Sequence, residues 1–447
     1  MTTRLRVLLG VGAVLALAAG PVLWGQVELP RLEALRLAAP VVLDGRLDEA
    51  CWATAPSASE FRALAAGKHA PQTPEPTQCQ VVFDDEALVL AVVCHEPRMG
   101  DLIAEAAERD GAIWLDDSVE IFLVHGTAHY YQFGINSRGT LYDARVAIQP
   151  DGTGGDLATG RLWDGAWEAV VRREADRWTI EARIPFATLD LTPRTPSEWR
   201  FSVGRTAARR REYSSWSPVV KGFHDLPRFG TLAGLDVDFR RFVIDGTALE
   251  MPALRVGRNA IRLAMPVLPE AGPFLVSSAL RPWSAEAGAM AFPAGRTVAA
   301  VDGVLSVDVE LTVLQGKVLH EAGLQILDAA SGRAVLQRRH LFRAPEPFVA
   351  ALPWAVLYPS DGTAEVAVDL AVTPESAHGR LRATLLGAAG LTREVAVAVD
   401  HPGSWRLSLP LADLPGGYYR VAVIGELADL GRCEAELRFL LTPGPFD

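Results

Sequence analysis

The stretch Trp114-Leu-Asp-Asp-Ser-Val-Glu-Ile-Phe-Leu-Val124 joins an aromatic residue and an acidic pair to an alternating apolar segment. Val119, Ile121 and Leu123 fall on one face of a β-strand, because side chains alternate along a strand. An indole can stack on the C–H face of a sugar ring, and a carboxylate can accept hydrogen bonds from hydroxyls. The stretch predicts a β-strand ending either at a sugar-binding surface or at a buried edge tryptophan beside an ordinary turn.

The same alternation recurs on both sides of this strand, with turn residues between the segments. Strands at this spacing favour an antiparallel β-sandwich over residues 32–236. One short helix is expected at residues 102–109, with Asp101 as its N-terminal cap. The predicted strands of this block are residues 78–83, 88–94, 119–124, 130–136, 141–147, 167–172, 178–184 and 201–205.

Two further blocks follow, at residues 245–345 and 346–447. Residues 305–313 alternate strictly between apolar and polar side chains, as a half-buried strand does. Leu414-Pro-Gly-Gly is a tight turn that leads into an amphipathic strand, which is common in immunoglobulin-like sandwiches. The fold class is therefore predicted as all-β, an antiparallel β-sandwich followed by two smaller immunoglobulin-like β-sandwiches.

Length and composition agree with several β-domains. A chain of 447 residues with 49% hydrophobic residues suggests about three domains, each with its own core. Glycine (39) and proline (30) are frequent, which favours short strands joined by turns.

The net charge of −11 argues against nucleic-acid binding, since neutralising phosphates needs a basic face. The one basic cluster, Arg209 to Arg211, is interpreted as a solvated turn. Neutral glycans need no charge complementarity and stay compatible with an acidic protein.

The N-terminal segment has the pattern of an export signal. Arg4 and Arg6 precede an uncharged run that extends to Trp24, and polar residues follow. Residues 1–26 are predicted to direct export to the extracellular space, the periplasm or the cell surface. The run is also long enough to span a bilayer, so an uncleaved anchor is the one membrane attachment left open.

Four cysteines are present, and an exported chain permits disulfides. Cys79 and Cys94 fall on the same face of two strands that form one predicted hairpin, which makes them the preferred pair among three possible pairings. The sequence contains no Cys-x-x-Cys motif, so a structural zinc site is not predicted.

An ordered series of segments extends over about 200 residues of the first block. The segments are Val42-Leu-Asp-Gly-Arg-Leu-Asp-Glu-Ala-Cys-Trp52, Val81-Val-Phe-Asp-Asp-Glu-Ala-Leu-Val-Leu90, residues 114–123, Tyr130-Tyr-Gln-Phe-Gly-Ile-Asn136, Trp178-Thr-Ile-Glu-Ala-Arg-Ile-Pro-Phe186, residues 201–205, Trp216 and Arg228-Phe-Gly-Thr-Leu232. No segment is specific alone, but in their order and spacing they resemble the family 9 carbohydrate-binding modules. The resemblance implies a secreted, non-catalytic β-sandwich that binds oligo- or polysaccharides, linked to polysaccharide breakdown.

The resemblance also implies site residues. Two tryptophans would clamp a terminal sugar ring, and polar side chains would fix its hydroxyls. One position departs from the family: Gly134 stands where a sugar-binding arginine is expected, and Arg205 or Arg145 would have to reach the same space. The implied site residues are Trp114, Glu120, Gln132, Asn136, Arg205 and Trp216.

No cofactor is predicted, although calcium often accompanies this fold. The candidate ligands for calcium are acidic residues in turns, and turn formation alone also explains them. These residues are Asp84, Asp85, Asp116 and Asp117.

Three other functions stay open. A glycoside hydrolase needs two carboxylates at a fixed separation, and Asp116, Asp117 and Glu120 come nearest. The module could also be a spacer of the cell surface that binds no sugar. A haem-binding electron carrier would use ligands from a set of methionine and histidine residues, namely Met99, His95, His125 and His129.

Overall fold

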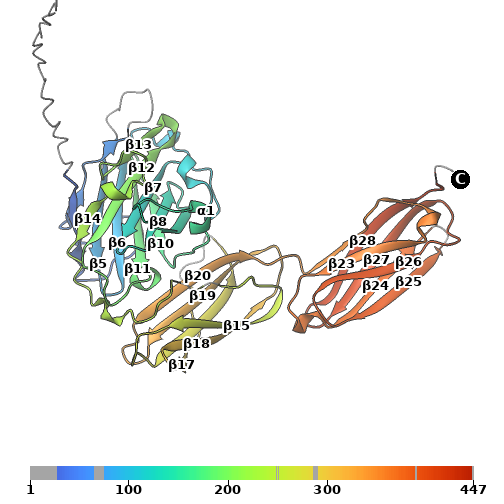
Figure 1. Cartoon of the computed structure of the whole chain (residues 1–447). Coiled ribbons are helices and arrows are strands. Elements are labelled where there is room, and N and C mark those ends of the chain that lie inside the picture. Colours follow the sequence, from blue (N-terminus) through green and yellow to red (C-terminus); the bar gives the residue numbers. More distant parts are fainter. Residues whose placement is uncertain are drawn as a thin grey trace, which may run out of the picture.

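The computed structural model describes residues 28–64, 75–247, 249, 251–284, 290–387 and 390–444. The chain forms three β-rich units in sequence order (Figure 1). The second unit lies against the first, and the third extends away from both. The predicted export segment lies outside the described residues. Among the described residues, no helix is long and apolar enough to cross a membrane.

The first unit is a sandwich of two sheets. The first sheet has the order β1-β14-β12-β7-β8-β9, with β13 beside β12 and β4 beside β13. Its strands are β1 (Arg31–Glu33), β4 (Arg62–Ala63), β7 (Ser118–Val124), β8 (His129–Asn136), β9 (Leu141–Ala147), β12 (Trp199–Ala207), β13 (Glu212–Ser215) and β14 (Gly230–Ala233).

The second sheet has the order β10-β11-β6-β5-β2, with β3 beside β5. Its strands are β2 (Leu35–Arg36), β3 (Ser57–Ala58), β5 (Thr77–Phe83), β6 (Ala87–His95), β10 (Glu168–Arg173) and β11 (Arg177–Pro185). The short helix α1 (Leu157–Gly160) lies beside β9.

The main core of the first unit lies between these two sheets. Strand β7 contributes Val119, Ile121 and Leu123, as its alternation predicts, and Trp178 and Trp199 are buried with them. A second hydrophobic cluster lies on the other face of the first sheet, where Phe122, Tyr130 and Tyr142 are buried. Both faces of β7 are therefore covered, and the face away from the second sheet is called the outer face below.

The second and third units each enclose a separate core between two sheets. The second unit contains β15 (Gly257–Pro266), β16 (Phe274–Pro282), β17 (Arg296–Val298), β18 (Val304–Val313), β19 (Leu319–Asp328) and β20 (Ala334–Arg343). The third contains β21 (Phe348–Ala351), β22 (Val356–Leu357), β23 (Thr363–Leu370), β24 (Gly379–Leu386), β25 (Thr392–Val399), β26 (Gly403–Pro410), β27 (Gly417–Leu427) and β28 (Gly431–Leu441).

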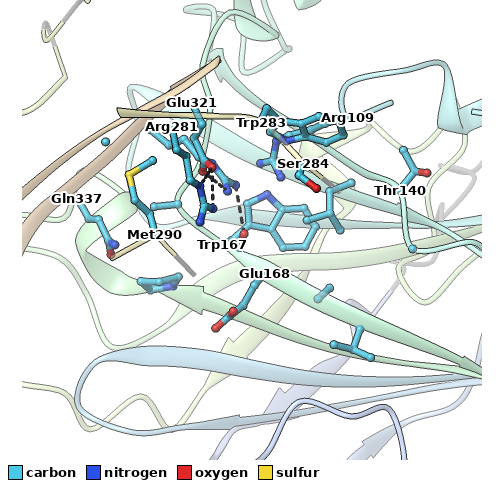
Figure 2. Close-up of a pocket in the computed structure, with 18 of the residues that line it drawn as sticks. Arg109, Thr140, Trp167, Glu168, Arg281, Trp283, Ser284, Met290, Glu321 and Gln337 are labelled. Atoms are coloured by element: carbon cyan, nitrogen blue, oxygen red, sulfur yellow. Dashed lines mark hydrogen bonds and ion pairs between the residues drawn. The ribbon is translucent and has the colours of Figure 1, made fainter. Parts of the chain in front are cut away.

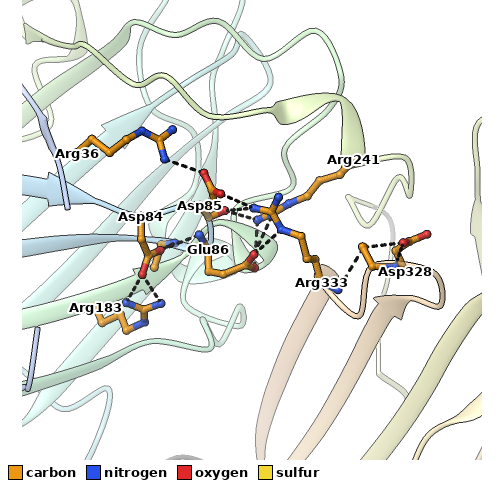
Figure 3. A network of polar contacts seen from close by, with 10 residues as sticks. Arg36, Asp84, Asp85, Glu86, Arg183, Arg241, Asp328 and Arg333 are labelled. Carbon is orange, nitrogen blue, oxygen red and sulfur yellow. Dashed lines mark hydrogen bonds and ion pairs between the residues drawn. The ribbon is translucent and has the colours of Figure 1, made fainter. Parts of the chain in front are cut away.

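Charged side chains tie the second unit to the first. Arg333, which precedes β20, donates to Glu86 at 2.8 Å, and Arg241 donates to the same carboxylate at 2.9 Å (Figure 3). On β20 itself, Arg339 donates to the carbonyl oxygen of Gly165 at 2.6 Å, and the amide of Leu341 donates to Asp164 at 2.8 Å. The two units are thus held together along the length of β20.

The predicted all-β class is confirmed, and each of the eight strands predicted in the first block is observed within two residues of its expected bounds. The helix expected at residues 102–109 is wrong. The amides of Ile103, Glu105 and Ala106 bond to the carboxylates of Asp117 and Asp116 instead of to helical carbonyls. These side chains hold the segment extended. Asp carboxylates compete with backbone carbonyls for amide hydrogen bonds, and here the carboxylates accept them.

The predicted hairpin of Cys79 and Cys94 is present as β5 and β6. The preferred disulfide is not formed, and both cysteines are buried free thiols. In the register, Cys79 lies opposite Val92 and Cys94 opposite Thr77, so the two thiols are diagonal neighbours rather than directly opposed. Burial raises the pKa of the Cys94 thiol to about 11, which disfavours the reactive thiolate.

Candidate functional site

The outer face of the first sheet brings Glu120 and Gln132 together. Phe122, on the same face of β7, lies directly opposite Gln132 on β8. The Gln132 amide donates to the Glu120 carboxylate at 2.5 Å, and both side chains are buried. Among the described residues, the buried amide oxygen Oε1 of Gln132 has no hydrogen-bond partner. A carboxyl–amide pair of this kind can accept and donate hydrogen bonds to hydroxyl groups.

Glycines flank Glu120 on both neighbouring strands. Gly204 of β12 and Gly134 of β8 both lie directly opposite it. A Cβ atom on Gly204 would come within 2.8 Å of the Phe223 ring, and one on Gly134 would overlap Ile113 Cδ1. Glycine is thus required where these side chains pack onto the strands. The space of the arginine expected at Gly134 is filled by Ile113.

Burial is the largest influence on the Glu120 carboxyl group. It raises the pKa of Glu120 to about 7, while the hydrogen bond from Gln132 acts in the opposite direction. Burial also lowers the pKa of His224, which accepts or donates a 2.8 Å hydrogen bond with the Tyr130 hydroxyl, to about 4. The polar groups beneath this surface are therefore held in an apolar setting that favours their neutral forms.

Trp114 lies at the rim of the outer face, half-buried, on the short 3₁₀ helix η2 (Ile113–Leu115). Its ring meets Tyr142 edge to face, with centroids 5.6 Å apart. The guanidinium of the exposed residue Arg161 lies 4.5 Å above the indole. The same guanidinium donates to the Tyr142 hydroxyl at 3.0 Å, so Arg161 covers one face of the Trp114 indole.

The structure does not bring Trp216 to Trp114. Trp216 follows β13, is 5% exposed and belongs to the core between the sheets, where it packs on Phe201 with ring centroids 5.6 Å apart. Its amide bonds to the Val203 carbonyl, so it faces inward as Val203 does. The two tryptophans lie on opposite faces of the first sheet and do not form the expected clamp.

Arg205 also points inward. It alternates in phase with Phe201 and Val203 on β12, and its guanidinium donates to Thr77 at 3.0 Å and to the His95 carbonyl at 2.7 Å. Arg145, the other residue considered for the arginine position, pairs with Asp190 at 2.7 Å. Neither arginine reaches the outer face beside Gly134.

Asn136 has a structural position at the end of β8. Its amide donates to Asp116 at 2.8 Å and to the Ala106 carbonyl at 2.9 Å, and its oxygen accepts the amide of Thr140. Asn136 is fully buried in this network. It supports the loop that leads to Trp114 rather than lining an open surface.

The four candidate calcium ligands are bonded within the protein. Asp84 accepts the amides of Glu86 and Ala87, Asp85 pairs with Arg36 (Figure 3), and Asp116 and Asp117 accept amides of residues 103–106. These are the bonds expected of acids that shape turns. Over the described parts of the chain, no group of three or more acidic, histidine or cysteine side chains is placed to hold a metal ion.

The residues considered for haem are spread along the sandwich. Met99 lies near the start of β7, because Asp101, two residues after it, shares a small cleft with Asp117. His125 follows the end of the same seven-residue strand, so roughly 20 Å of β7 separates His125 from the region of Met99. His125 donates to the Leu189 carbonyl at 2.7 Å and is stacked against Tyr131.

The sequence interpretation missed three residues of the outer face. Tyr142 alternates correctly on β9 but carries no signal for ligand binding. Phe223 and Arg161 lie in irregular segments, where periodicity gives no orientation. Phe223 covers one side of Glu120, and Tyr142 with Trp114 lies toward the other. The outer-face site is defined here as Trp114, Glu120, Gln132, Tyr142, Arg161 and Phe223.

No curated protein sequence matches the chain. Among solved structures, a family 9 module from Caldicellulosiruptor kristjanssonii in complex with glucose has 17% identity and a TM-score of 0.32, covering 46% of this chain and 95% of its own. The same organism's family 9 module in complex with cellotriose has 17% identity and a TM-score of 0.33, covering 50% and 100%. A protein from Bacteroides uniformis, proposed to bind carbohydrate, has 17% identity and a TM-score of 0.35, covering 46% and 99%.

A family profile supports the resemblance directly. Residues 43–233 match the family described as carbohydrate family 9 binding domain-like. The matched residues include β5 to β14, and therefore both sheets of the sandwich and the outer-face site. The similarity to the family described as carbohydrate family 9 binding domain-like therefore extends over most of the first unit.

Proposed function

We propose that this chain is a non-catalytic carbohydrate-binding protein whose first unit binds a saccharide at the outer-face site. The observation that carries the proposal is the carboxyl–amide pair Glu120–Gln132 flanked by aromatic rings, within a domain of the carbohydrate-binding family 9 type. Trp114 supplies a stacking face at the rim, and Phe223 replaces Trp216 as the aromatic group on the other side of Glu120.

The acidic side chains of the first unit support binding rather than hydrolysis. Glycoside hydrolysis needs two carboxyl groups that flank the scissile bond. Asp116 and Asp117, the nearest candidates to Glu120 in sequence, accept backbone amides of a neighbouring loop. They therefore have a structural explanation, and Glu120 alone belongs to the proposed site.

Isothermal titration of the full chain against a panel of oligosaccharides tests this proposal. Loss of one stacked ring costs about 1–3 kcal/mol by analogy with base–aromatic stacking, which is about 5- to 150-fold in affinity. We expect Trp114→Ala and Phe223→Ala each to weaken binding by that amount. The control is Trp354→Ala, which removes a tryptophan that is 70% exposed in the third unit.

If no oligosaccharide gives heat, the first unit is a spacer and the proposal is wrong. If binding occurs but neither Trp114→Ala nor Phe223→Ala changes the affinity, the saccharide binds elsewhere. Sugar release that disappears in Glu120→Gln would instead establish a hydrolase.

We also infer export from the N-terminal pattern, in which Arg4 and Arg6 precede an apolar run. Expression of the full-length gene in a bacterial host, followed by N-terminal sequencing of the protein in each compartment, tests it. Recovery of the protein only inside the cell, with Met1 retained, would contradict export.

A further inference from the structure

A cavity of about 530 Å³ lies between the first and second units (Figure 2). Small-molecule sites commonly have volumes of about 300–1,000 Å³ and often lie at domain interfaces. The first unit contributes residues near β9 and β10, and the second contributes residues of β16, β19 and β20. The cavity is separate from the outer-face site, and none of the six residues of that site lines it.

The walls of the cavity are fixed by paired charges. Glu321 accepts hydrogen bonds from Arg281 at 2.8 Å and from Arg339 at 3.0 Å, and its side chain is 3% exposed. The other end of the Arg339 guanidinium donates to the carbonyls of Gly165 and Trp167 in the first unit. One guanidinium thus joins the two walls, so the cavity has a defined shape before any ligand enters.

The floor on the side of the first unit is equally fixed. The indole Nε1 of Trp167 donates to Asp143 at 2.7 Å, and the same carboxylate pairs with Arg109. Asp143 is completely buried behind this floor. Trp167 is therefore locked in orientation by a hydrogen bond as well as by packing.

Most of the charged groups that line the cavity are paired. Arg109 pairs with Asp143, and Arg281 and Arg339 share Glu321. Arg338, which also lines the cavity, pairs with Asp190. At the rim, Arg138 and Glu168 are both exposed and of opposite sign. Because Arg281 and Arg339 share one carboxylate, these groups carry one positive charge in excess, which is held within the Glu321 network. The paired groups offer a neutral ligand many fixed donors and acceptors.

Apolar surface accompanies these polar groups. Trp283 of the second unit is half-buried and lines the same cavity as Trp167 (Figure 2). Phe292 packs onto β19 at Gly323, where a Cβ atom would come within 2.9 Å of its ring. Glu168 and Gln337 line the cavity and make no side-chain hydrogen bond to any described residue, so their polar atoms are available to a ligand.

We propose that the cavity between the first and second units is a second binding site, which takes a neutral oligosaccharide. Aromatic faces match the C–H faces of sugar rings, and hydrogen-bonding groups fixed in pairs match hydroxyls. This proposal rests on the proposed carbohydrate-binding function but uses different residues, with Trp283 as the stacking group and Gln337 as a hydrogen-bonding group.

The test is isothermal titration of the full chain with short neutral gluco-, xylo-, manno- and galacto-oligosaccharides, and with an oligogalacturonate as the acidic probe. The variants are Trp283→Ala and Gln337→Ala for the cavity and Trp114→Ala for the outer-face site. Trp354→Ala is the control for loss of an exposed tryptophan. We expect a neutral oligosaccharide whose affinity falls about fivefold or more in Trp283→Ala and stays unchanged in Trp114→Ala and Trp354→Ala.

Binding that responds to Trp114→Ala while Trp283→Ala and Gln337→Ala leave every affinity unchanged overturns the cavity site and leaves the proposed function standing. If no oligosaccharide binds to the wild type, both proposals fall. If the cavity binds only the oligogalacturonate, the proposal that its ligand is neutral is wrong. Should Trp283→Ala fail to fold, as judged by circular dichroism, the loss of affinity in Gln337→Ala decides the question.

Discussion

At the scale of single residues, Glu120 shows how packing sets the chemistry of the candidate site. Glycines on both neighbouring strands admit Phe223 and Ile113 on either side of Glu120, which is 6% exposed. Burial then raises its pKa to about 7. A neutral carboxyl group can donate a hydrogen bond as well as accept one, so near neutral pH Glu120 can act in both ways toward a hydroxyl.

This carboxyl group should make the first unit less stable as pH rises. The folded-state pKa of about 7 exceeds the ordinary value of 4.5, so the folded state binds more protons between these values. The free energy of unfolding therefore falls as pH rises from 4.5 through 7, by on the order of 3 kcal/mol in total. Glu120→Gln should remove this dependence and stabilise the protein above pH 7.

Urea unfolding at pH 5 and pH 8 measures the effect as the difference between the wild type and Glu120→Gln. The control is Glu198→Gln, which changes an exposed carboxyl group paired with Arg31. Equal pH dependence in the wild type and in Glu120→Gln would contradict the raised pKa.

At the scale of elements, period-2 alternation predicts a strand such as β18 well, because that strand has one apolar side facing a core and one exposed side. Strand β9 was predicted with its observed bounds, Leu141–Ala147. The alternation of Phe201 and Val203 along β12 predicts that Arg205 also points inward, as observed. The family resemblance instead placed Arg205 in the binding site. Strand β16 (Phe274–Pro282) was missed, because its second half alternates poorly and is only half-buried.

The partners of a strand cannot be deduced from its own alternation. Trp216 faces the core because β13 pairs with β12 in a register that places it beside Val203. A slip of one residue would turn it to the outer face. The sequence shows neither this pairing nor the irregular segment that brings Phe223 over Gly204, so the outer-face site could be predicted only in part.

Strand β20 should contribute strongly to stability through Arg339. This guanidinium satisfies the Gly165 and Trp167 carbonyls and shares the buried carboxylate of Glu321 with Arg281. Arg339→Ala removes this donor from the Trp167 carbonyl and one of several donors from the Gly165 carbonyl and from Glu321, and should cost about 2–4 kcal/mol. Urea unfolding measures the loss. Arg262→Ala is the control, because its pair with Asp308 is exposed to solvent and should contribute little to stability. Similar losses in both variants would show that the docking of β20 adds little.

At the scale of the whole molecule, the two junctions between units differ in kind. The first and second units are joined by the buried ion pair of Arg338 with Asp190 and by the hydrogen bonds of Arg339 to the Gly165 and Trp167 carbonyls, and they enclose the cavity between them. The second and third units meet at an isolated bridge between Val256 and Val372, with Leu430 packed against both cores. We therefore expect the first and second units to unfold together. The third unit extends away from them (Figure 1) and should unfold largely on its own.

Calorimetry of the full chain should therefore resolve two transitions, one for the first and second units together and one for the third. An oligosaccharide in the cavity contacts both of the first two units, so it should raise the temperature of the joint transition alone. At a concentration of 100 times the Kd, the stabilisation is about 2.7 kcal/mol. In Trp283→Ala this shift should disappear, while the transition of the third unit stays in place. A shift in the transition temperature of the third unit would contradict binding in the cavity. Three separate transitions in the wild type would show that the first two units do not unfold as one body.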